Sequence, residues 1–341
     1  MSARLGLAVL LLLFPACAQP AVWGLNYDHD RTGRLLEDYW LEEWDTVVED
    51  FHEMKALGAN LVRIHLQLEK FMQTAEQADP ISLAQLARLV RLAEETGLRL
   101  DLTGLGCYHK QAVPPWYDAL SEDARWLVQT RFWEHVAATC AGSPALYCYD
   151  LMNEPVLPDA RWKETEWLPG EGFAGKHFVQ RIALDLAGRT REQVARAWVD
   201  TLVAAIRKHD PRTKITVGEI PWAFVFPGAG PFFSAPEVGD RLDLVSVHFY
   251  PRTGEVDKAL AALEVYRSAK PLIVEEMFPL ECRIEELDAF VEGSRAWVAG
   301  YVGFYWGETI EELSSKDGDL AAAILKEWLQ YFRNRAPTSR G

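Results

Sequence analysis

The sequence predicts a (β/α)8 TIM barrel, in which eight strands alternate with helices around one core. From residue 23 onward, short apolar runs alternate with amphipathic stretches eight times in about 320 residues. No Ser/Gly/Pro-rich linker, low-complexity tract or repeat interrupts this alternation, so a single domain over 19–341 is expected. A doubly wound open sheet would show a glycine-rich turn after the first strand, where this chain reads Asn26-Tyr27-Asp28-His29. The barrel is therefore the preferred fold class.

Apolar runs of strand length are separated by stretches with the period of a helix. The predicted strands are 23–27, 60–65, 99–104, 145–152, 214–218, 242–249, 272–275 and 300–306. The predicted helices include 44–57, 82–96, 121–140, 191–209, 256–269, 284–298 and 320–332. The first three of these helices are followed by Gly58, Gly97 and Gly142, at positions where a C-terminal glycine is common.

Residues 1–18 have the features of a secretory signal peptide. A positive charge at Arg4 precedes an apolar run over 5–14, and Ala16 and Ala18 form a small-x-small cleavage signal. The run is shorter than the roughly 20 residues of a membrane span, and no later stretch is long and uncharged enough to form one. Export is therefore expected, either by cleavage or with a lipoprotein signal that ends before Cys17 and anchors the chain through this cysteine.

Composition narrows the range of partners. Lysine and arginine number 35 against 50 aspartates and glutamates, and the net charge of −15 disfavours nucleic acid and anionic membranes as partners.

No metal or cofactor is expected, because His52-Glu53 lacks the second histidine of a zinc motif and no cysteine spacing fits a metal site. Cys140 and Cys148 are the closest cysteines after the signal segment, and a disulfide and buried thiols are both open.

Polar side chains gather where the predicted strands end. In a barrel this end carries the catalytic groups. The residues are Arg63 and His65 on the second strand, Asn153-Glu154-Pro155 on the fourth, His248-Phe249-Tyr250 on the sixth, Glu275-Glu276 on the seventh and Trp306 on the eighth. A cap or a salt bridge would explain any single one, but the whole set favours a catalytic site.

Two carboxylic acids facing each other across the mouth of a barrel suit the hydrolysis of a glycosidic bond. One acid donates a proton to the leaving oxygen, while the other stays ionised and attacks the anomeric carbon. Glu154 on the fourth strand and a glutamate on the seventh have this relation. Strand alternation allows either Glu275 or Glu276 to point inward. A nearby Arg63 would lower the pKa of one carboxyl group by charge attraction.

At these residues the chain resembles glycoside hydrolase family 5, of the clan of retaining (β/α)8 glycosidases that includes cellulases and β-mannanases. The likeness covers nearly the whole chain after the signal segment. The matching pieces are Gly58-Ala59-Asn60-Leu61-Val62-Arg63-Ile64, Tyr149-Asp150-Leu151-Met152-Asn153-Glu154-Pro155, His248-Phe249-Tyr250, 271–276 and Phe304-Tyr305-Trp306.

The resemblance implies a role for each of these side chains. It implies that Glu154 is the acid/base, that Asn153 binds the sugar 2-hydroxyl and that Arg63 steadies the nucleophile. It also implies that His248 and Tyr250 orient the carboxylates and the reacting sugar, and that Trp306 forms the floor under that sugar.

The chain departs from the family pattern at two places. The family's nucleophile is followed by an aromatic residue and glycine, whereas here Glu276 is followed by Met277; Glu276 is still the closer match, with Glu275 as the alternative. The family commonly has a histidine on the third strand, where this chain has Leu102-Thr103-Gly104. His109, several residues later, either reaches the site from the loop or lies on the surface.

The long loop at 156–190 is a further feature, since loops of this length are usually functional or disordered. Its aromatic residues either form an ordered rim around the substrate or seal the loop onto the barrel; they are Trp162, Trp167, Phe173 and Phe178. Further rim candidates are Trp116, Trp222 and Tyr108.

These observations together predict an exported retaining β-glycosidase that cleaves a plant-type β-linked polysaccharide or oligosaccharide. The double glutamate resembles that of β-mannanases, so β-1,4-mannan is favoured over β-1,4-glucan, the substrate of a cellulase. The alternatives are a carbohydrate-binding barrel without catalysis and an enzyme that transfers the sugar to an acceptor.

Overall fold

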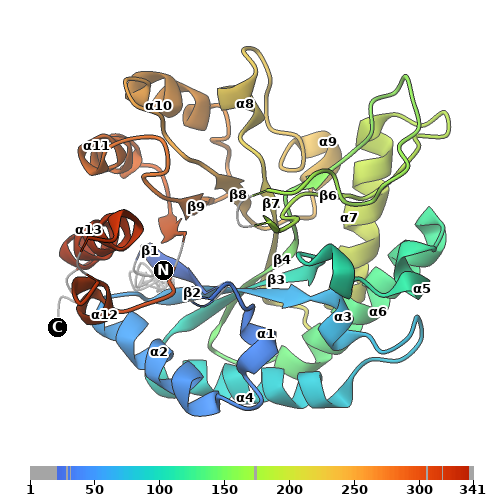
Figure 1. Ribbon diagram of the computed structural model, residues 1–341. Helices are drawn as coiled ribbons and strands as arrows, with labels where there is room; N and C mark the ends of the chain where they lie inside the picture. Colours follow the sequence, from blue (N-terminus) through green and yellow to red (C-terminus); the bar gives the residue numbers. More distant parts are fainter. Residues whose placement is uncertain are drawn as a thin grey trace, which may run out of the picture.

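The computed structural model describes residues 21–27, 30, 32–172, 175–304, 306–316 and 318–337, and eight parallel strands close into a barrel (Figure 1). Around the barrel the strands follow the order β1-β10-β9-β8-β7-β4-β3-β2. Their bounds are β1 Val22–Tyr27, β2 Leu61–Gln67, β3 Arg99–Gly106, β4 Leu146–Asn153, β7 Lys214–Glu219, β8 Val245–His248, β9 Leu272–Met277 and β10 Gly300–Gly303. Each predicted strand overlaps one of these, so the predicted fold class is confirmed. The predicted signal segment 1–18, with Cys17, lies outside the described residues.

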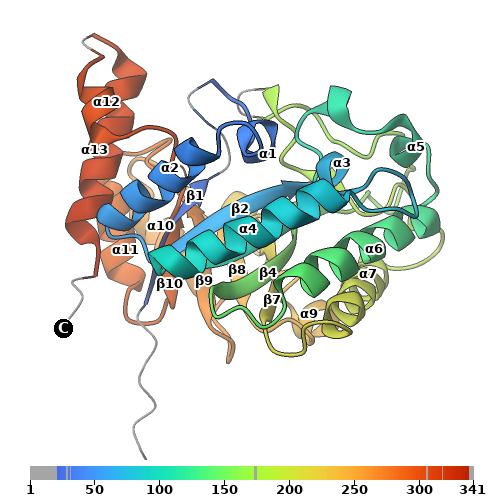
Figure 2. The ribbon, with the colours of Figure 1, turned by 90° about the horizontal axis from the view of Figure 1, so that it is seen from below.

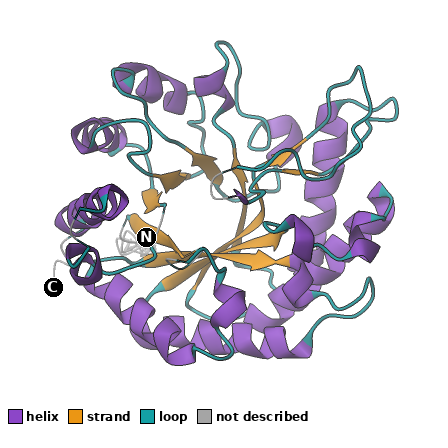
Figure 3. Ribbon diagram, viewed as in Figure 1, coloured by secondary structure: helices purple, strands orange, loops and turns teal. Residues whose placement is uncertain are grey.

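Helices surround the barrel and cover its outer face (Figure 3). The long ones are α2 Trp44–Ala56, α4 Pro80–Thr96, α6 Glu122–Cys140, α7 Arg191–Arg207, α10 Val256–Glu264, α11 Ile284–Ser294 and α13 Leu320–Arg335. The short ones are α1 Leu36–Tyr39, α3 Leu68–Phe71, α5 Pro115–Asp118, α8 Trp222–Val225, α9 Pro236–Gly239 and α12 Ile310–Ser314. Figure 2 shows α2, α4 and α6 lying along the outside of the strands. The helices predicted at 256–269 and 284–298 end early, because the chain must turn back to begin β9 and β10.

Local sequence signals account for the helix ends. Asp79 caps α4 by accepting hydrogen bonds from the amides of Ile81 and Ser82, and Pro80 occupies the first turn. The same helix ends at Gly97, whose φ of 66° is left-handed and favours glycine. Thr190 and Gln193 form a reciprocal capping box at the start of α7. These signals stop the helices where the chain must enter or leave the barrel.

Indole rings pack directly on the strand backbones at two glycines. A Cβ atom at Gly303 would lie 2.2 Å from Cζ2 of Trp328, and one at Gly104 would lie 2.3 Å from Cζ2 of Trp133. Both tryptophans are fully buried. The missing side chains therefore let α13 and α6 approach the barrel closely.

The cysteines and the helices bear on the expectation that the chain is exported. Cys107, Cys140, Cys148 and Cys282 are all unpaired, so the possible bridge between Cys140 and Cys148 is not formed. Among the described residues, no helix combines the length and the apolar character needed to cross a bilayer.

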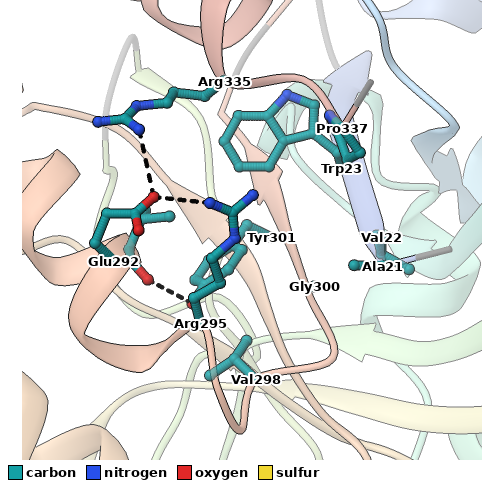
Figure 4. Close-up of a pocket in the computed structure, with 11 residues that line it drawn as sticks. Ala21, Val22, Trp23, Glu292, Arg295, Val298, Gly300, Tyr301, Arg335 and Pro337 are labelled. Carbon is teal, nitrogen blue, oxygen red and sulfur yellow. Dashed lines mark hydrogen bonds and ion pairs between the residues drawn. The ribbon is translucent and has the colours of Figure 1, made fainter. Parts of the chain in front are cut away.

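A small cavity of about 50 Å³ lies at the amino-terminal end of the barrel (Figure 4). Arg295 and Arg335 both bind the carboxylate of Glu292 beside it, at 2.9 and 3.4 Å. Sugar-sized ligands occupy pockets of several hundred Å³. This cavity is therefore too small for a sugar.

Replacing Gly303 by alanine should lower the free energy of unfolding by about 1–3 kcal/mol, because the new methyl group collides with Trp328. Urea denaturation measures the change. Gly170→Ala is the matched control, since a Cβ atom at Gly170 would meet no other atom within 4 Å and the backbone there is not left-handed. Equal stabilities of the two variants would contradict close packing of α13 on β10.

Candidate active site

The carboxyl ends of the strands bring together buried polar side chains around Arg63 of β2. Its Nη1 donates to Oε1 of Glu276 at 2.6 Å and to Oδ1 of Asn26 at 3.0 Å. Its Nη2 donates to Oδ2 of Asp150 at 2.8 Å and to Oδ1 of Asn153 at 2.9 Å. A cation withdrawn from water requires such partners. Arg63 therefore fixes side chains of β1, β4 and β9 relative to one another.

His248, at the end of β8, lies between three carboxylates. Its Nδ1 is 3.0 Å from Oε1 of Glu154 and 3.6 Å from Oε1 of Glu276, and its Nε2 is 3.5 Å from Oε2 of Glu275. Burial opposes protonation, but the charge of Glu276 and the contacts with Glu154 and Glu275 raise the pKa of His248 to about 10. At neutral pH His248 is therefore an imidazolium that donates from Nδ1 to Glu154.

A β-bulge explains why two consecutive glutamates of β9 both contact groups inside the barrel. Successive residues of β8 pair with Val274 and then with Glu276, so β9 has one extra residue at Glu275. In a regular strand the two side chains would point to opposite faces. Glu276 lies at the mouth, where the hydroxyl of Tyr250 donates to its Oε2 at 2.6 Å, and Glu275 is fully buried.

The surroundings of Glu276 favour its ionised form. Burial alone would raise the pKa of Glu276, but the charges of His248 and Arg63 outweigh it and hold this pKa below its usual value. The Tyr250 hydroxyl contributes to the lowering through its hydrogen bond. Burial and the neighbouring Glu276 raise the pKa of Tyr250 well above its ordinary value, so it stays a donor.

Glu154 follows β4 in a backbone conformation that few residues other than glycine adopt. Its φ is 44°, and its amide donates to the carbonyl of Gly218 at 2.9 Å. Its side chain is 18% exposed, more than the 8% of Glu276. Carboxylate oxygens of Glu154 and Glu276 lie within 4.8 Å of each other. So close an approach fits the short separation of carboxyl groups, about 5 Å, at which one carboxylate acts as nucleophile rather than through an intervening water.

Below the mouth, a second acidic pair supports this site. Burial and the charge of Glu275 raise the pKa of Asp101 well above its ordinary value. Burial would also raise the pKa of Glu275, but the charges of Arg63 and His248 hold this pKa below its usual value. Asp101 is therefore protonated and Glu275 ionised. A Cβ atom at Gly218 would lie 2.6 Å from Nε2 of His248 and 2.7 Å from Oε2 of Glu275, so this glycine leaves the space in which they meet.

The long loop reaches Asn153, the residue expected to bind the sugar 2-hydroxyl. While its Oδ1 accepts from Arg63, its Nδ2 donates to the carbonyl of Phe178 at 3.0 Å. Since a side-chain amide has two hydrogens to donate, the loop takes one of them. The loop therefore forms part of the site's wall. Figure 1 shows β6 Gln180–Arg181 of this loop beside the mouth of the barrel, and β6 pairs with β5 Pro155–Val156.

The structure does not bring Trp306 to the carboxylates. Its amide donates to the carbonyl of Asn26 at 2.8 Å, which holds its backbone beside the end of β1. The side chain is 1% exposed and lines a hollow between α2 and α12 with Glu53 and Thr309. This corrects the expected placement of Trp306 as a floor under the sugar.

The other predicted binding residues lie in the loops. His109 is half-buried directly before the 3-10 turn at Lys110–Ala112. Trp222 begins α8, stacks on Phe226 at 5.8 Å and lines a hollow with Arg191. Their sugar contacts stay predictions.

Of the loop tryptophans, Trp167 is buried and donates from Nε1 to the carbonyl of Asp118 at 3.2 Å, whereas Trp162 is 53% exposed. The loop is thus sealed at Trp167 and open at Trp162.

Several members of the site were missed by sequence reasoning. Asn26 and Asp150 bind Arg63, while Asp101 lies beside Glu275. Their signal in the sequence was a polar residue inside an apolar strand, such as Asp101 between two leucines and Asp150 between a tyrosine and a leucine. Burial of such a residue requires a partner.

In the part of the chain that the structure describes, two groups of residues have the side-chain types of a metal site. Ligand atoms lie within 4.8 Å of one another in the group Glu154, His248 and Glu276 and in the group Asp101, Cys148 and Glu275. Arg63 and His248 already balance the carboxylates of both groups, and burial raises the pKa of the Cys148 thiol well above its usual value. Both groups are thus explained without an ion, and the expectation of no metal or cofactor stays a prediction.

A parallel barrel with two close carboxylates at its carboxyl end defines the class of barrel glycoside hydrolases. Within this class, the family model described as cellulase (glycosyl hydrolase family 5) matches residues 26–276. The chain belongs to glycosyl hydrolase family 5, and the resemblance found in its sequence is confirmed. No curated protein sequence matches the chain.

Solved structures share its fold at low sequence identity. The exo-β-1,4-mannosidase Op5Man5 from Opitutaceae bacterium strain TAV5 is 17% identical with a TM-score of 0.69, and the match covers 94% of this chain and 60% of that one. The GH5_18 protein from Streptomyces cattleya in complex with GlcNAc is 17% identical (TM-score 0.64; 94% and 82% covered). The β-1,4-mannanase from the common sea hare Aplysia kurodai is 14% identical (TM-score 0.61; 95% of both chains covered). The chain thus spans less than two thirds of the length of Op5Man5.

Arg63→Leu should lower the free energy of unfolding by about 3–5 kcal/mol, because it leaves buried carboxylates without their cation. Chemical denaturation checks the value. Arg196→Leu, which breaks an exposed ion pair with Asp240, should cost less than about 1 kcal/mol. Similar losses in both variants would show that Arg63 has no special role in stability.

Stability should fall as the pH rises from neutral, because His248 loses its proton. The pKa of His248 is raised from an unfolded value near 6.5 to about 10. The contribution of the protonated His248 to the free energy of unfolding is therefore complete below about pH 6.5 and is lost as the pH rises through about 10. Denaturation curves of the wild type and His248→Gln between pH 6 and 10 measure this. The difference between them should shrink as the pH rises; a constant difference would refute the cationic state.

Proposed function

We propose that this chain is an exported retaining β-glycosidase that hydrolyses β-1,4-linked mannosides. The observation that carries this proposal is the close approach of Glu154 and Glu276 in unlike surroundings. Glu276 is nearly buried between two cations, Arg63 and His248. Glu154 is partly exposed and contacts only one of these cations, His248. Such asymmetry suits a nucleophile and an acid/base.

The geometry supports a double displacement. Glu276 attacks the anomeric carbon, and Glu154 donates its proton to the glycosidic oxygen as the bond to the leaving sugar breaks. A glycosyl ester on Glu276 results. Glu154, now ionised, takes a proton from a water molecule, whose oxygen attacks the same carbon and releases Glu276.

The neighbours of the two carboxylates assist both steps. Arg63 and His248 stabilise the negative charge that returns to Glu276 when the ester is cleaved. Tyr250 holds Oε2 of Glu276, so that the carboxylate keeps one orientation. Asn153, which contacts Arg63, is the proposed ligand of the sugar 2-hydroxyl.

Two observations support mannan over glucan as the source of the substrate. The double glutamate at the end of β9 resembles that of β-mannanases, and the structural neighbours include proteins described as a mannosidase and a mannanase. β-1,4-Glucan is the alternative, which the experiment below includes.

Export also belongs to this proposal. The segment 1–18 has a charged start, an apolar run and a small-residue cleavage signal. In the favoured form of this proposal the segment is cleaved after Ala18. In the other form the chain keeps a lipid anchor at Cys17.

Glu154→Gln should lower kcat/KM for mannohexaose by about 10²–10⁴-fold, because proton transfer to the leaving oxygen is lost. Glu276→Gln should lower it at least as much, because no nucleophile remains. Reducing-sugar release from mannohexaose and cellohexaose measures both. The exposed Glu281, paired with Arg252, provides the control Glu281→Gln, which should keep full activity.

Trapping with a 2-deoxy-2-fluoro-β-mannosyl fluoride identifies the nucleophile. Peptide mapping should find the sugar on Glu276; a label on Glu275 would reverse the assignment within the bulge. Binding of both hexaoses without any hydrolysis would replace the enzyme by a carbohydrate-binding barrel.

A further inference from the structure

Three aromatic rings form a continuous bridge across one side of the barrel mouth. Phe178, in the long loop, contacts Tyr108 after β3 at a centroid distance of 4.9 Å and Phe304 after β10 at 6.1 Å. Both contacts are edge-on, with interplanar angles of 61° and 88°. We call Tyr108, Phe178 and Phe304 the aromatic bridge.

Hydrogen bonds on both sides of Phe178 hold the central ring in place. The amide of His177 donates to the carbonyl of Tyr108 at 2.9 Å, and Asn153 donates to the carbonyl of Phe178 at 3.0 Å. Two residues later, Gln180 donates from Nε2 to the carbonyl of Leu105 at 2.9 Å. The bridge is thus a fixed wall and not the tip of a free loop.

The bridge also joins the buried polar cluster. The hydroxyl of Tyr108 is 2.5 Å from Nδ1 of His65, whose Nε2 is 3.0 Å from Oδ1 of Asn26. Asn26 in turn contacts Arg63. The wall therefore stands directly beside the groups that hold Glu276.

The order of the strands shows which side of the mouth is closed. β1 and β2 lie between β10 and β3 in the barrel, so rings that join the ends of β10 and β3 cross the sector of β1 and β2. Glu154 follows β4, outside this sector. The leaving sugar must lie on the side of Glu154, because Glu154 protonates the oxygen of the bond that breaks. On the other side of the attacked sugar, any further sugars of the substrate would have to pass through the closed sector of β1 and β2.

We propose that the aromatic bridge limits the glycone side of the site to a single sugar, so that the enzyme removes one mannose at a time from the non-reducing end. This inference rests on the proposed function. Phe178 is then a specificity-determining residue, because its ring blocks the path of a longer chain. The leaving side, toward β7 and β8, accepts the remainder of the oligosaccharide.

Borohydride-reduced mannohexaose distinguishes the two ends of the substrate, because only the former reducing end carries an alditol. Wild-type enzyme should first release free mannose together with the alditol shortened by one sugar. It should also hydrolyse 4-nitrophenyl β-mannopyranoside, which has one sugar on the glycone side. Early time points analysed by chromatography and mass spectrometry measure these products.

Phe178→Ala should open the bridge and permit internal cleavage. The ratio of mannobiose and mannotriose to mannose should rise by about tenfold or more, the factor that corresponds to 1.4 kcal/mol of discrimination. Leu127→Ala removes an exposed apolar side chain of α6, outside the bridge and the predicted binding residues, and should leave the product pattern unchanged. If Phe178→Ala does not fold, Phe178→Leu, which keeps an apolar side chain but shortens the wall, takes its place.

The outcomes separate this inference from the proposed function. Mannobiose and mannotriose among the first wild-type products would overturn the single-sugar pocket and leave the glycosidase intact. An unchanged product pattern in Phe178→Ala would also overturn the role of the bridge. Absence of hydrolysis with every substrate, together with no label on Glu276, would instead refute the proposed function.

Discussion

The buried positive charge of Arg63 is the constraint on which the polar interior of this barrel depends. Its guanidinium is fully buried and binds two carboxylates and two amides from three strands. A planar fork with several donors suits this task better than the single ammonium of lysine. Because each partner is also withdrawn from water, the cation and its partners are stable only together. Glu276, the proposed nucleophile, is thus placed by a network that begins on β2, with β1 and β10 between β2 and its own strand.

His248 extends this balance of charge toward the mouth. Two cations, Arg63 and His248, face the ionised Glu275 and Glu276, and Asp101 avoids a further negative charge by keeping its proton. The carboxyl group of Asp150 is an intermediate case, since burial and the charge of Glu275 raise its pKa while Arg63 opposes this rise. The difference between Glu154 and Glu276 is therefore a property of the whole cluster and not of either residue.

The sequence was sufficient for the barrel and for most of the carboxyl-end residues, because periodicity and strand order do not depend on fine geometry. Arg63, Asn153, Glu154, His248, Tyr250 and Glu276 could be named for this reason, and the structure brings them together. Alternation along β9 could not decide between Glu275 and Glu276, since a bulge depends on pairing with the neighbouring strands. Trp306 was misplaced because its side chain packs between α2 and α12, and alternation along a strand does not reveal the position of these helices. Asp101 and Asp150 were passed over because a lone acid in an apolar run shows its partner only in three dimensions.

Gly218 links the buried acidic groups below the mouth to Glu154, the proposed acid/base. Its carbonyl accepts the amide of Glu154, its amide donates to Asp150 at 2.8 Å, and its missing side chain leaves space for His248 and Glu275. A methyl group at this position would collide with both His248 and Glu275, so a side chain at 218 requires both of them to move. Position 218 is thus constrained by the charges of the network as well as by its packing, because the two groups that a new side chain would displace are an imidazolium and a carboxylate that balance each other.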